Sequence, residues 1–360
     1  MSRAAKASID LAAIRHNYRL ARSLAPNARA AAIIKANAYG HGAVKVAQAL
    51  AAEADAFGVA CIEEAMELRD AGIKQPVVLL EGFFDADELD YIARNGLWTA
   101  VHSEHQIDAL AAADLPSPVN VWLKMDSGMH RLGIPPRDFH AAYTRLRALP
   151  QVGEITLMSH FACADDLAQD TTERQIAVFD QAVEGIDAPH SLANSPATLA
   201  WPQARRDWLR PGLMLWGATP FEVAQDEAAK LQPAMTLSTE IIAIHDLDVG
   251  DAVGYGASFI CQRPSRIATI AMGYGDGYPR HAVSGTPVVV NGQRTVTAGR
   301  VSMDMMTIDI TDIADAKIGD VVELWGRQLP VSEVAQFCST IPYTLLTCLT
   351  RRVALEYHNA

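Results

Sequence analysis

The chain has 360 residues, of which 50% are hydrophobic and 20% are charged, so we expect a packed globular protein rather than a disordered one. Its formal net charge is -12 and its pI is near 5.3, which argues against a nucleic acid as its partner. The five cysteines are scattered and none has the spacing of metal ligands, so we expect reduced thiols and no metal site.

The N-terminal segment predicts neither export nor membrane insertion. Lys6 and Asp10 interrupt its apolar residues, so the segment lacks the continuous apolar core of a signal peptide. The longest uncharged apolar stretch, AQFCSTIPYTLLTCLT, contains Pro342 and is too short to span a bilayer. We therefore expect a cytoplasmic protein with no membrane partner.

Short apolar segments alternate with helical patterns over the first 230 residues. The strand candidates are AAAIIKAN, AFGVAC, PVVLLEG, WTAVHS, VNVWLKMD, EITLMSH, HSLANS and LRPGLMLWG. Eight strand–helix units favour a (β/α)₈ barrel, although periodicity alone leaves a doubly wound open sheet as the alternative. A barrel places functional side chains at the carboxyl ends of its strands, where Lys35, His160, Ser195 and Arg210 fall.

From about residue 235 the sequence changes to short β segments separated by glycines. Asn291-Gly292, between PVVV and RTV, predicts a type I′ hairpin. We expect a barrel domain at residues 1–230 and a mainly β C-terminal domain at residues 231–360.

A lysine follows a buried strand in IIKANAYGHG and precedes a glycine-rich turn. There Lys35 is either a surface residue or a desolvated amine presented to an aldehyde cofactor. A phosphorylated cofactor also needs an anion site, and Ser195 lies at a helix start in NSPAT. For NSP alone an ordinary capped turn is favoured. Arg210 and Gly212 in RPGLML, at the expected end of the eighth strand, shift the preference to a phosphate site.

Three other residues are ambiguous when taken alone. Lys124, in WLKMDSGMHRLG, fits a solvated loop, and Tyr255, in GYGAS, fits a packed turn. His160 has no partner at metal spacing, so we expect it to make an orienting hydrogen bond.

Together these segments resemble the alanine racemase family. IIKANAYGHG is similar to the segment that attaches pyridoxal 5′-phosphate, and the segments LKMDSGMHRLG, SHFACAD, NSPAT, RPGLMLWG, VGYGAS, GYGDGYPR, GRVSMDMM and IPYTLLTCLTRRV follow in family order over essentially the whole chain. The resemblance implies an N-terminal (β/α)₈ barrel followed by a β domain, in a homodimer with shared active sites. The implied reaction interconverts L-alanine and D-alanine, either to supply D-alanine for peptidoglycan or for alanine catabolism.

The resemblance also implies a role for each matching residue. Lys35 would carry the cofactor as an internal aldimine and serve as the base for D-alanine, whereas Tyr255 would reach into the partner subunit's site and serve L-alanine. Arg131 and the backbone of Met303 would contact the substrate, and Lys124, as a carbamate, would orient Arg131. The remaining cofactor contacts would come from Tyr39, Ser195, Gly212, Leu213 and Tyr343 at the phosphate, Arg210 at the pyridine nitrogen, and His160 behind Arg210.

Three other functions fit parts of the pattern. A decarboxylase with the same cofactor would be expected to place a carboxylate, not Arg210, at the ring nitrogen. A racemase of broader specificity would be expected to carry an export signal. A non-catalytic cofactor carrier would not need Tyr255 or a β domain.

Overall fold

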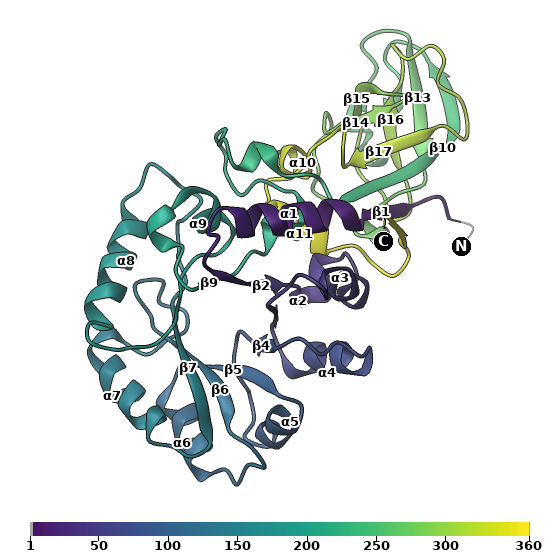
Figure 1. Ribbon diagram of the computed structural model, residues 1–360. Coiled ribbons are helices and arrows are strands. Elements are labelled where there is room, and N and C mark those ends of the chain that lie inside the picture. The colour runs from purple at the N-terminus through teal and green to yellow at the C-terminus, as the bar shows by residue number, and fades with distance from the viewer. Residues whose placement is uncertain (1–2, 360) are drawn as a thin grey trace.

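The computed structural model describes residues 3–359, and its first half is an all-parallel barrel (Figure 1). Its strands run in the order β8-β7-β6-β5-β4-β3-β2-β9. They are β2 (Arg29–Ile33), β3 (Ala56–Val59), β4 (Val77–Leu79), β5 (Leu97–Val101), β6 (Val119–Lys124), β7 (Val152–Met158), β8 (His190–Ser191) and β9 (Trp208–Leu209). The N–H of Arg210 donates to Ala193 O at 2.9 Å and closes the seam between β8 and β9. The barrel prediction is confirmed, and an open sheet is excluded.

Helices cover the outside of the barrel (Figure 1). They are α1 (Leu11–Ser23), α3 (Ala43–Leu50), α4 (Ile62–Asp70), α5 (Glu88–Arg94), α6 (Glu104–Ala112), α7 (Pro136–Arg147), α8 (Thr171–Ala182) and α9 (Ser195–Ala200). In α7 the buried residues Phe139, Ala142, Tyr143 and Leu146 recur at the spacing of one helical face, which is why this polar segment packs as a helix.

Three tryptophans fill the barrel interior. The Trp208 ring lies 5.6 Å from both the Trp98 and the Trp122 ring centroids, although β9 lies far from β5 and β6 in strand order. The rings therefore meet across the barrel. The Arg29 guanidinium lies 4.2 Å from the Trp208 ring centroid, at the amino ends of the strands. This packing closes that end and leaves the carboxyl ends of the strands for a site.

The second half is a mainly β domain, as predicted. Six strands in the order β13-β16-β15-β14-β17-β10 close through a β13–β10 pairing into a second, smaller barrel. They are β10 (Met235–Leu247), β13 (Ser265–Ile270), β14 (Pro287–Val290), β15 (Gln293–Thr297), β16 (Met306–Asp309) and β17 (Val321–Trp325), and they are accompanied by β11 (Ala252–Val253), β12 (Phe259–Ile260), α10 (Val331–Phe337) and α11 (Pro342–Thr347). Asn291 and Gly292 have φ of 51° and 75°, which confirms the type I′ hairpin.

The first strand of the chain belongs to the second sheet. β1 (Lys6–Asp10) pairs antiparallel with β10 and parallel with β18 (Ala354–His358), so both ends of the chain meet there. Asp10 then caps α1 by accepting from the N–H of Ala12 at 3.0 Å. The division at residue 230 stays a prediction, and its outermost residues 1–2 and 360 lie outside the described part of the chain. No helix within residues 3–359 is both long and apolar enough to cross a membrane.

Candidate active site

A cavity of about 830 Å³ lies at the carboxyl ends of the barrel strands. Four cationic side chains, those of Lys35, Lys124, Arg131 and Arg210, line it together with the carboxylates of Glu81 and Asp165. The cavity brings together ten of the predicted site residues: Lys35, Tyr39, Lys124, Arg131, His160, Ser195, Arg210, Gly212, Leu213 and Tyr343. Its surplus of positive charge suits an anionic ligand.

The turn after Lys35 is left-handed, which the sequence did not predict. It is α2 (Lys35–Tyr39), where the four consecutive residues from Ala36 to Tyr39 have φ between 51° and 53°. Each non-glycine residue in this conformation costs about 1–2 kcal/mol. The turn ends at Gly40, and the Asn37 Oδ1 accepts from the N–H of Ala43 at 2.9 Å. A strained backbone therefore presents Lys35 to the cavity.

Arg210 is buried and held by several acceptors. Its guanidinium donates to the Ser191 carbonyl at 2.7 Å, the Ser191 hydroxyl at 2.6 Å and the Ser159 carbonyl at 2.7 Å. Burial lowers the pKa of Arg210 to about 10, so the group stays charged at neutral pH. Burial and the nearby cation Arg210 hold the pKa of His160 well below its usual range, so the neutral ring can accept from Arg210 at 3.4 Å through Nδ1.

Lys124 lies at the end of β6 and is buried in the cavity wall. Burial, followed by the charges of Arg210 and Arg131, lowers the pKa of Lys124 to about 8. The neutral amine form of this lysine is therefore far more populated near neutral pH than that of an ordinary lysine.

Ser195 begins α9 and forms a hydrogen-bonded cradle with the segment that follows β9. The N–H groups of Gly212 and Met214 donate to the Ser195 Oγ at 2.8 and 3.2 Å. The hydroxyl accepts both bonds, so its single hydrogen must point to a third acceptor. Asn194 caps the helix by accepting from the Ala197 N–H at 3.1 Å, and Pro196 occupies the first turn, where no N–H is needed.

Two tyrosines border this cradle. The Tyr39 and Tyr343 rings lie 6.0 Å apart, and the Trp216 ring lies 5.5 Å from Tyr39 on the other side. Burial raises the pKa of Tyr343 to about 12 and that of Tyr39 further still. Both hydroxyls therefore keep their hydrogens and can donate to a phosphate.

Tyr255 and Met303 do not line this cavity. Both belong to the C-terminal domain, where the Tyr255 side chain is 69% exposed and the Met303 side chain is 53% exposed. The turn that carries Tyr255 lies against Arg300, because a Cβ at Gly256 would be 3.3 Å from that guanidinium. The side chains of Tyr255 and Met303 are therefore both largely exposed on the C-terminal domain.

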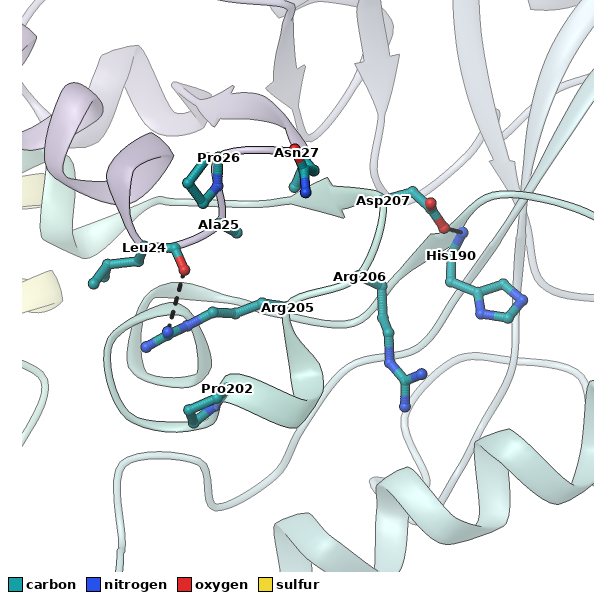
Figure 2. Close-up of a pocket in the computed structure, with 10 residues that line it drawn as sticks. Leu24, Ala25, Pro26, Asn27, His190, Pro202, Arg205, Arg206 and Asp207 are labelled. Atoms are coloured by element: carbon teal, nitrogen blue, oxygen red, sulfur yellow. Dashed lines mark hydrogen bonds between the residues drawn. The ribbon is translucent and has the colours of Figure 1, made fainter.

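A second cavity, of about 540 Å³, lies at the opposite end of the barrel, among the starts of β2, β8 and β9 (Figure 2). Both arginines that line it already bind other groups of the protein. Arg205 donates to the carbonyls of Leu24, Thr198 and Leu199, and Arg206 pairs with Asp180. In Figure 2 the side chains of Arg205, Arg206 and His190 point away from one another, so they converge on no ligand.

Glu64 was missed by the sequence analysis. Its carboxylate accepts from the N–H groups of Ala36 and Ala60, at 2.6 and 2.8 Å. The only signal was a glutamate in the first turn of α4, which is typical of ordinary helix capping.

A parallel barrel with a cationic, tyrosine-bordered cavity at the carboxyl ends of its strands is the architecture of a (β/α)₈ enzyme, in which that end carries the active site. Residues 9–220 match the model of the alanine racemase N-terminal domain, and residues 234–357 match that of the alanine racemase C-terminal domain. The chain belongs to the alanine racemase family.

Individual relatives agree with this assignment. The chain is 59% identical over 355 residues to the catabolic alanine racemase of Pseudomonas putida, covering 99% of both chains. It is equally similar, at 59% identity and with the same coverage, to the alanine racemase of Pseudomonas taetrolens. The crystal structure of the biosynthetic alanine racemase from Pseudomonas aeruginosa superposes with a TM-score of 0.96 at 48% identity, covering 99% of this chain and all of that one.

Proposed function

We propose that the protein interconverts L-alanine and D-alanine with pyridoxal 5′-phosphate as its cofactor. The observation that carries this proposal is the single cavity in which Lys35, Arg210 and the Ser195 cradle meet. The relatives include a catabolic and a biosynthetic enzyme, so the proposal is confined to the reaction. We also propose a cytoplasmic location and the division into domains at residue 230, with β1 contributed to the second sheet.

The residues present fit this cofactor. The remaining hydrogen of the Ser195 hydroxyl and the protonated tyrosines Tyr39 and Tyr343 supply donors to a phosphate, and Gly212 and Leu213 supply close backbone. Lys35 supplies the amine that attaches the aldehyde. When bound, the cofactor withdraws electrons from the amino acid and makes its α-hydrogen acidic.

Arg210 distinguishes this site from one in which a carboxylate keeps the pyridine nitrogen of the cofactor protonated. A guanidinium donates hydrogen bonds and stays charged, so it cannot be the partner that holds a proton on a pyridine nitrogen. We propose that Arg210 donates to that nitrogen, with His160 accepting from it behind. Moderating the electron withdrawal in this way would limit side reactions such as transamination.

Racemisation requires removal of a proton from one face of the α-carbon and delivery of a proton to the other. A single base would have to cross the plane of the substrate, so we assign one base to each face. Lys35 moves the proton on the D-alanine side and Tyr255 moves it on the L-alanine side. Each base is left in the protonation state from which the reverse reaction starts.

Tyr255 reaches the site in a homodimer with shared active sites. It does not line the cavity of its own chain and is largely exposed, as is Met303 in the same domain. Tyr274, Met303 and Met305 add further exposed apolar surface to this domain, which is typical of an interaction surface. We propose that this surface of one subunit closes the cavity of the other and places the Met303 backbone at the substrate.

Arg131 would bind the substrate carboxylate. The neutral fraction of Lys124 is the form that reacts with carbon dioxide, losing one proton to give a carbamate. Such a carbamate would place a negative charge in the cluster that contains Arg131 and orient its guanidinium.

The test is solvent deuterium incorporation into alanine, started separately from each enantiomer, with wild type and Tyr255→Phe compared. Wild type should exchange and interconvert both enantiomers. Tyr255→Phe should still exchange D-alanine but fail with L-alanine, whereas Tyr91→Phe, a substitution on the barrel exterior in α5, should behave as wild type.

Two results would count against the proposal. If wild type exchanges neither enantiomer, alanine is the wrong substrate, and decarboxylation or another amino acid becomes the better assignment. If Tyr255→Phe exchanges both enantiomers at wild-type rates, the assignment of Tyr255 as a base is wrong.

A further inference from the structure

The left-handed turn at residues 36–39 needs external support. Four consecutive non-glycine residues at φ near 50° together cost several kcal/mol relative to an ordinary right-handed turn. Such a conformation persists only where surrounding contacts determine it. Inside the segment, the Ala38 N–H donates to Ile34 O at 2.8 Å and the Gly40 N–H donates to Ala36 O at 3.1 Å, which leaves the Ala36 N–H to find a partner elsewhere.

That partner is Glu64, on the neighbouring α4. One carboxylate oxygen accepts from the Ala36 N–H at 2.6 Å, and the other accepts from the Ala60 N–H at 2.8 Å. Both bonds run from a backbone donor to an ionised acceptor, the class of hydrogen bond that is shortest and strongest in proteins. Glu64 thus ties the turn after β2 to the loop after β3.

Helix capping alone does not account for this arrangement. Glu64 is the third residue of α4, and a glutamate there in a capping box accepts from the N–H of the capping residue, which is Cys61 here. Glu64 instead accepts from Ala60, one residue earlier, and directs its second oxygen to Ala36, 28 residues away in sequence. Its neighbour Glu63 is exposed and makes only local hydrogen bonds, with Cys61 and its own backbone N–H.

Ala36, the residue whose N–H Glu64 binds, lies in sequence between the two residues of this turn with proposed roles in the site, Lys35 and Tyr39. Ala36 follows Lys35, and Tyr39 ends the same turn, and all three line the cavity. Among residues 3–359, Glu64 does not line the cavity, so its negative charge does not face an anionic ligand there. A shift of Ala36 would move the Lys35 amine and the Tyr39 hydroxyl together.

We propose that Glu64 is a positioning residue that holds the strained turn 36–39 and thereby places Lys35 and Tyr39 for covalent attachment of the cofactor. It touches neither cofactor nor substrate and acts through the Ala36 N–H. The inference rests on the proposed use of Lys35, but the clamp itself is a property of the protein without its cofactor.

The experiment compares Glu64→Ala and Glu64→Gln with the matched control Glu63→Ala on the same helix. The first readout is hydrogen–deuterium exchange over residues 34–42 in protein freed of cofactor. Loss of a hydrogen bond to a charged acceptor should speed exchange of this segment about tenfold or more in Glu64→Ala. The segments of β6 and β7 should remain protected.

The second readout is pyridoxal 5′-phosphate itself, titrated into each cofactor-free protein and then reduced with borohydride. The fraction of bound cofactor fixed to Lys35 reports placement of the amine, which a general loss of stability does not change selectively. Glu64→Ala should bind cofactor at least about tenfold more weakly and fix a smaller fraction of what it binds. Glu64→Gln keeps one acceptor oxygen but turns an amide donor toward the second N–H, so its loss should be intermediate.

The outcomes separate this inference from the proposed function. Wild-type exchange and a wild-type fixed fraction in Glu64→Ala would overturn the clamp. If Glu64→Ala does not fold, Glu64→Gln decides by the same two readouts. If wild type itself fixes no cofactor at Lys35, the proposed function fails, and the exchange measurement alone still decides whether Glu64 holds the turn. An equal effect of Glu63→Ala would assign both results to α4 in general and refute a specific role of Glu64.

Discussion

Replacing Gly212 with alanine should weaken cofactor binding through one contact, with the Tyr39 hydroxyl. Gly212 has φ of -121°, so it does not use the left-handed region that favours glycine. The obstacle is space, because a Cβ at this position would lie 2.8 Å from the Tyr39 hydroxyl oxygen. The next atom of that ring would be 3.5 Å away, an ordinary contact distance.

The Tyr39 ring has little room to move away from a new methyl group. Its ring lies between Trp216, at 5.5 Å, and Tyr343, at 6.0 Å, and the residue is buried. Overpacking of this kind costs about 1–3 kcal/mol of stability. Displacement of a hydroxyl that donates to a phosphate should cost a further ~1.5–3 kcal/mol of binding, or about 10- to 100-fold in Kd.

The assay is a double-mutant cycle of Gly212→Ala and Tyr39→Phe, with Kd for pyridoxal 5′-phosphate and the Tm of the cofactor-free protein measured for each variant. Tyr39→Phe removes the oxygen that the new methyl would meet. In that background Gly212→Ala should change Kd and Tm much less, because the contacts that remain, with the Tyr39 ring at 3.5 Å and the Ile33 Cβ at 3.6 Å, are ordinary van der Waals distances. If Gly212→Ala is as costly with phenylalanine at position 39 as with tyrosine, the contact with the hydroxyl is not the cause.

Two further predictions concern stability alone. The pKa of Lys124 is lowered from 10.5 to about 8 in the folded protein, so between about pH 8 and 10.5 the unfolded chain holds a proton that the folded chain has lost. The free energy of unfolding should therefore rise with pH across that window, by about 3 kcal/mol from this group. Urea titrations of the cofactor-free protein at several pH values measure this rise, which should be absent in Lys124→Met. Parallel pH profiles of the two proteins would refute the prediction. Gly292→Ala should lower the free energy of unfolding by about 1 kcal/mol, because φ is 75° while the nearest atom to the new Cβ would be 3.8 Å away, so the cost is one of backbone conformation and not of space. The measurement is the urea midpoint, and an unchanged midpoint would show that the hairpin tolerates this backbone in alanine.

The sequence predicted what depends on local pattern. All eight barrel strands fall within or beside the predicted apolar segments, because strands buried on both faces are continuous apolar runs. The last two were overestimated. In HSLANS the strand β8 has only two residues, and LRPGLMLWG overlaps the two-residue β9 only at Leu209. Soon after each strand, Asn194 and Gly212 start a helical segment. The hairpin at Asn291 was predictable because its turn type depends on two residues.

The site was predictable only in part. Ten predicted residues lie in one cavity: nine because the barrel gathers the carboxyl ends of its strands, and Tyr343 because α11 of the C-terminal domain packs there. The left-handed turn after Lys35 had no signal, since alanine and asparagine do not specify it, and its support by Glu64 depends on packing between two loops. Tyr255 and Met303 lie outside the cavity of their own chain, and their roles, like the homodimer proposed above, stay predictions.

The position of β1 constrains the order in which the strands of this chain can pair during folding. Lys6 to Asp10 leave the ribosome first, yet their partners are β10 and the last strand, β18. The barrel strands β2 to β9 have their neighbours close behind them in sequence and can assemble as synthesis proceeds. One edge of the N-terminal strand can pair once β10 is released, but its other edge stays unpaired until residues 354–358 are released. The last event of folding is therefore the joining of the two ends, and a nascent chain stalled near its C-terminus would hold a finished barrel and an incomplete sheet.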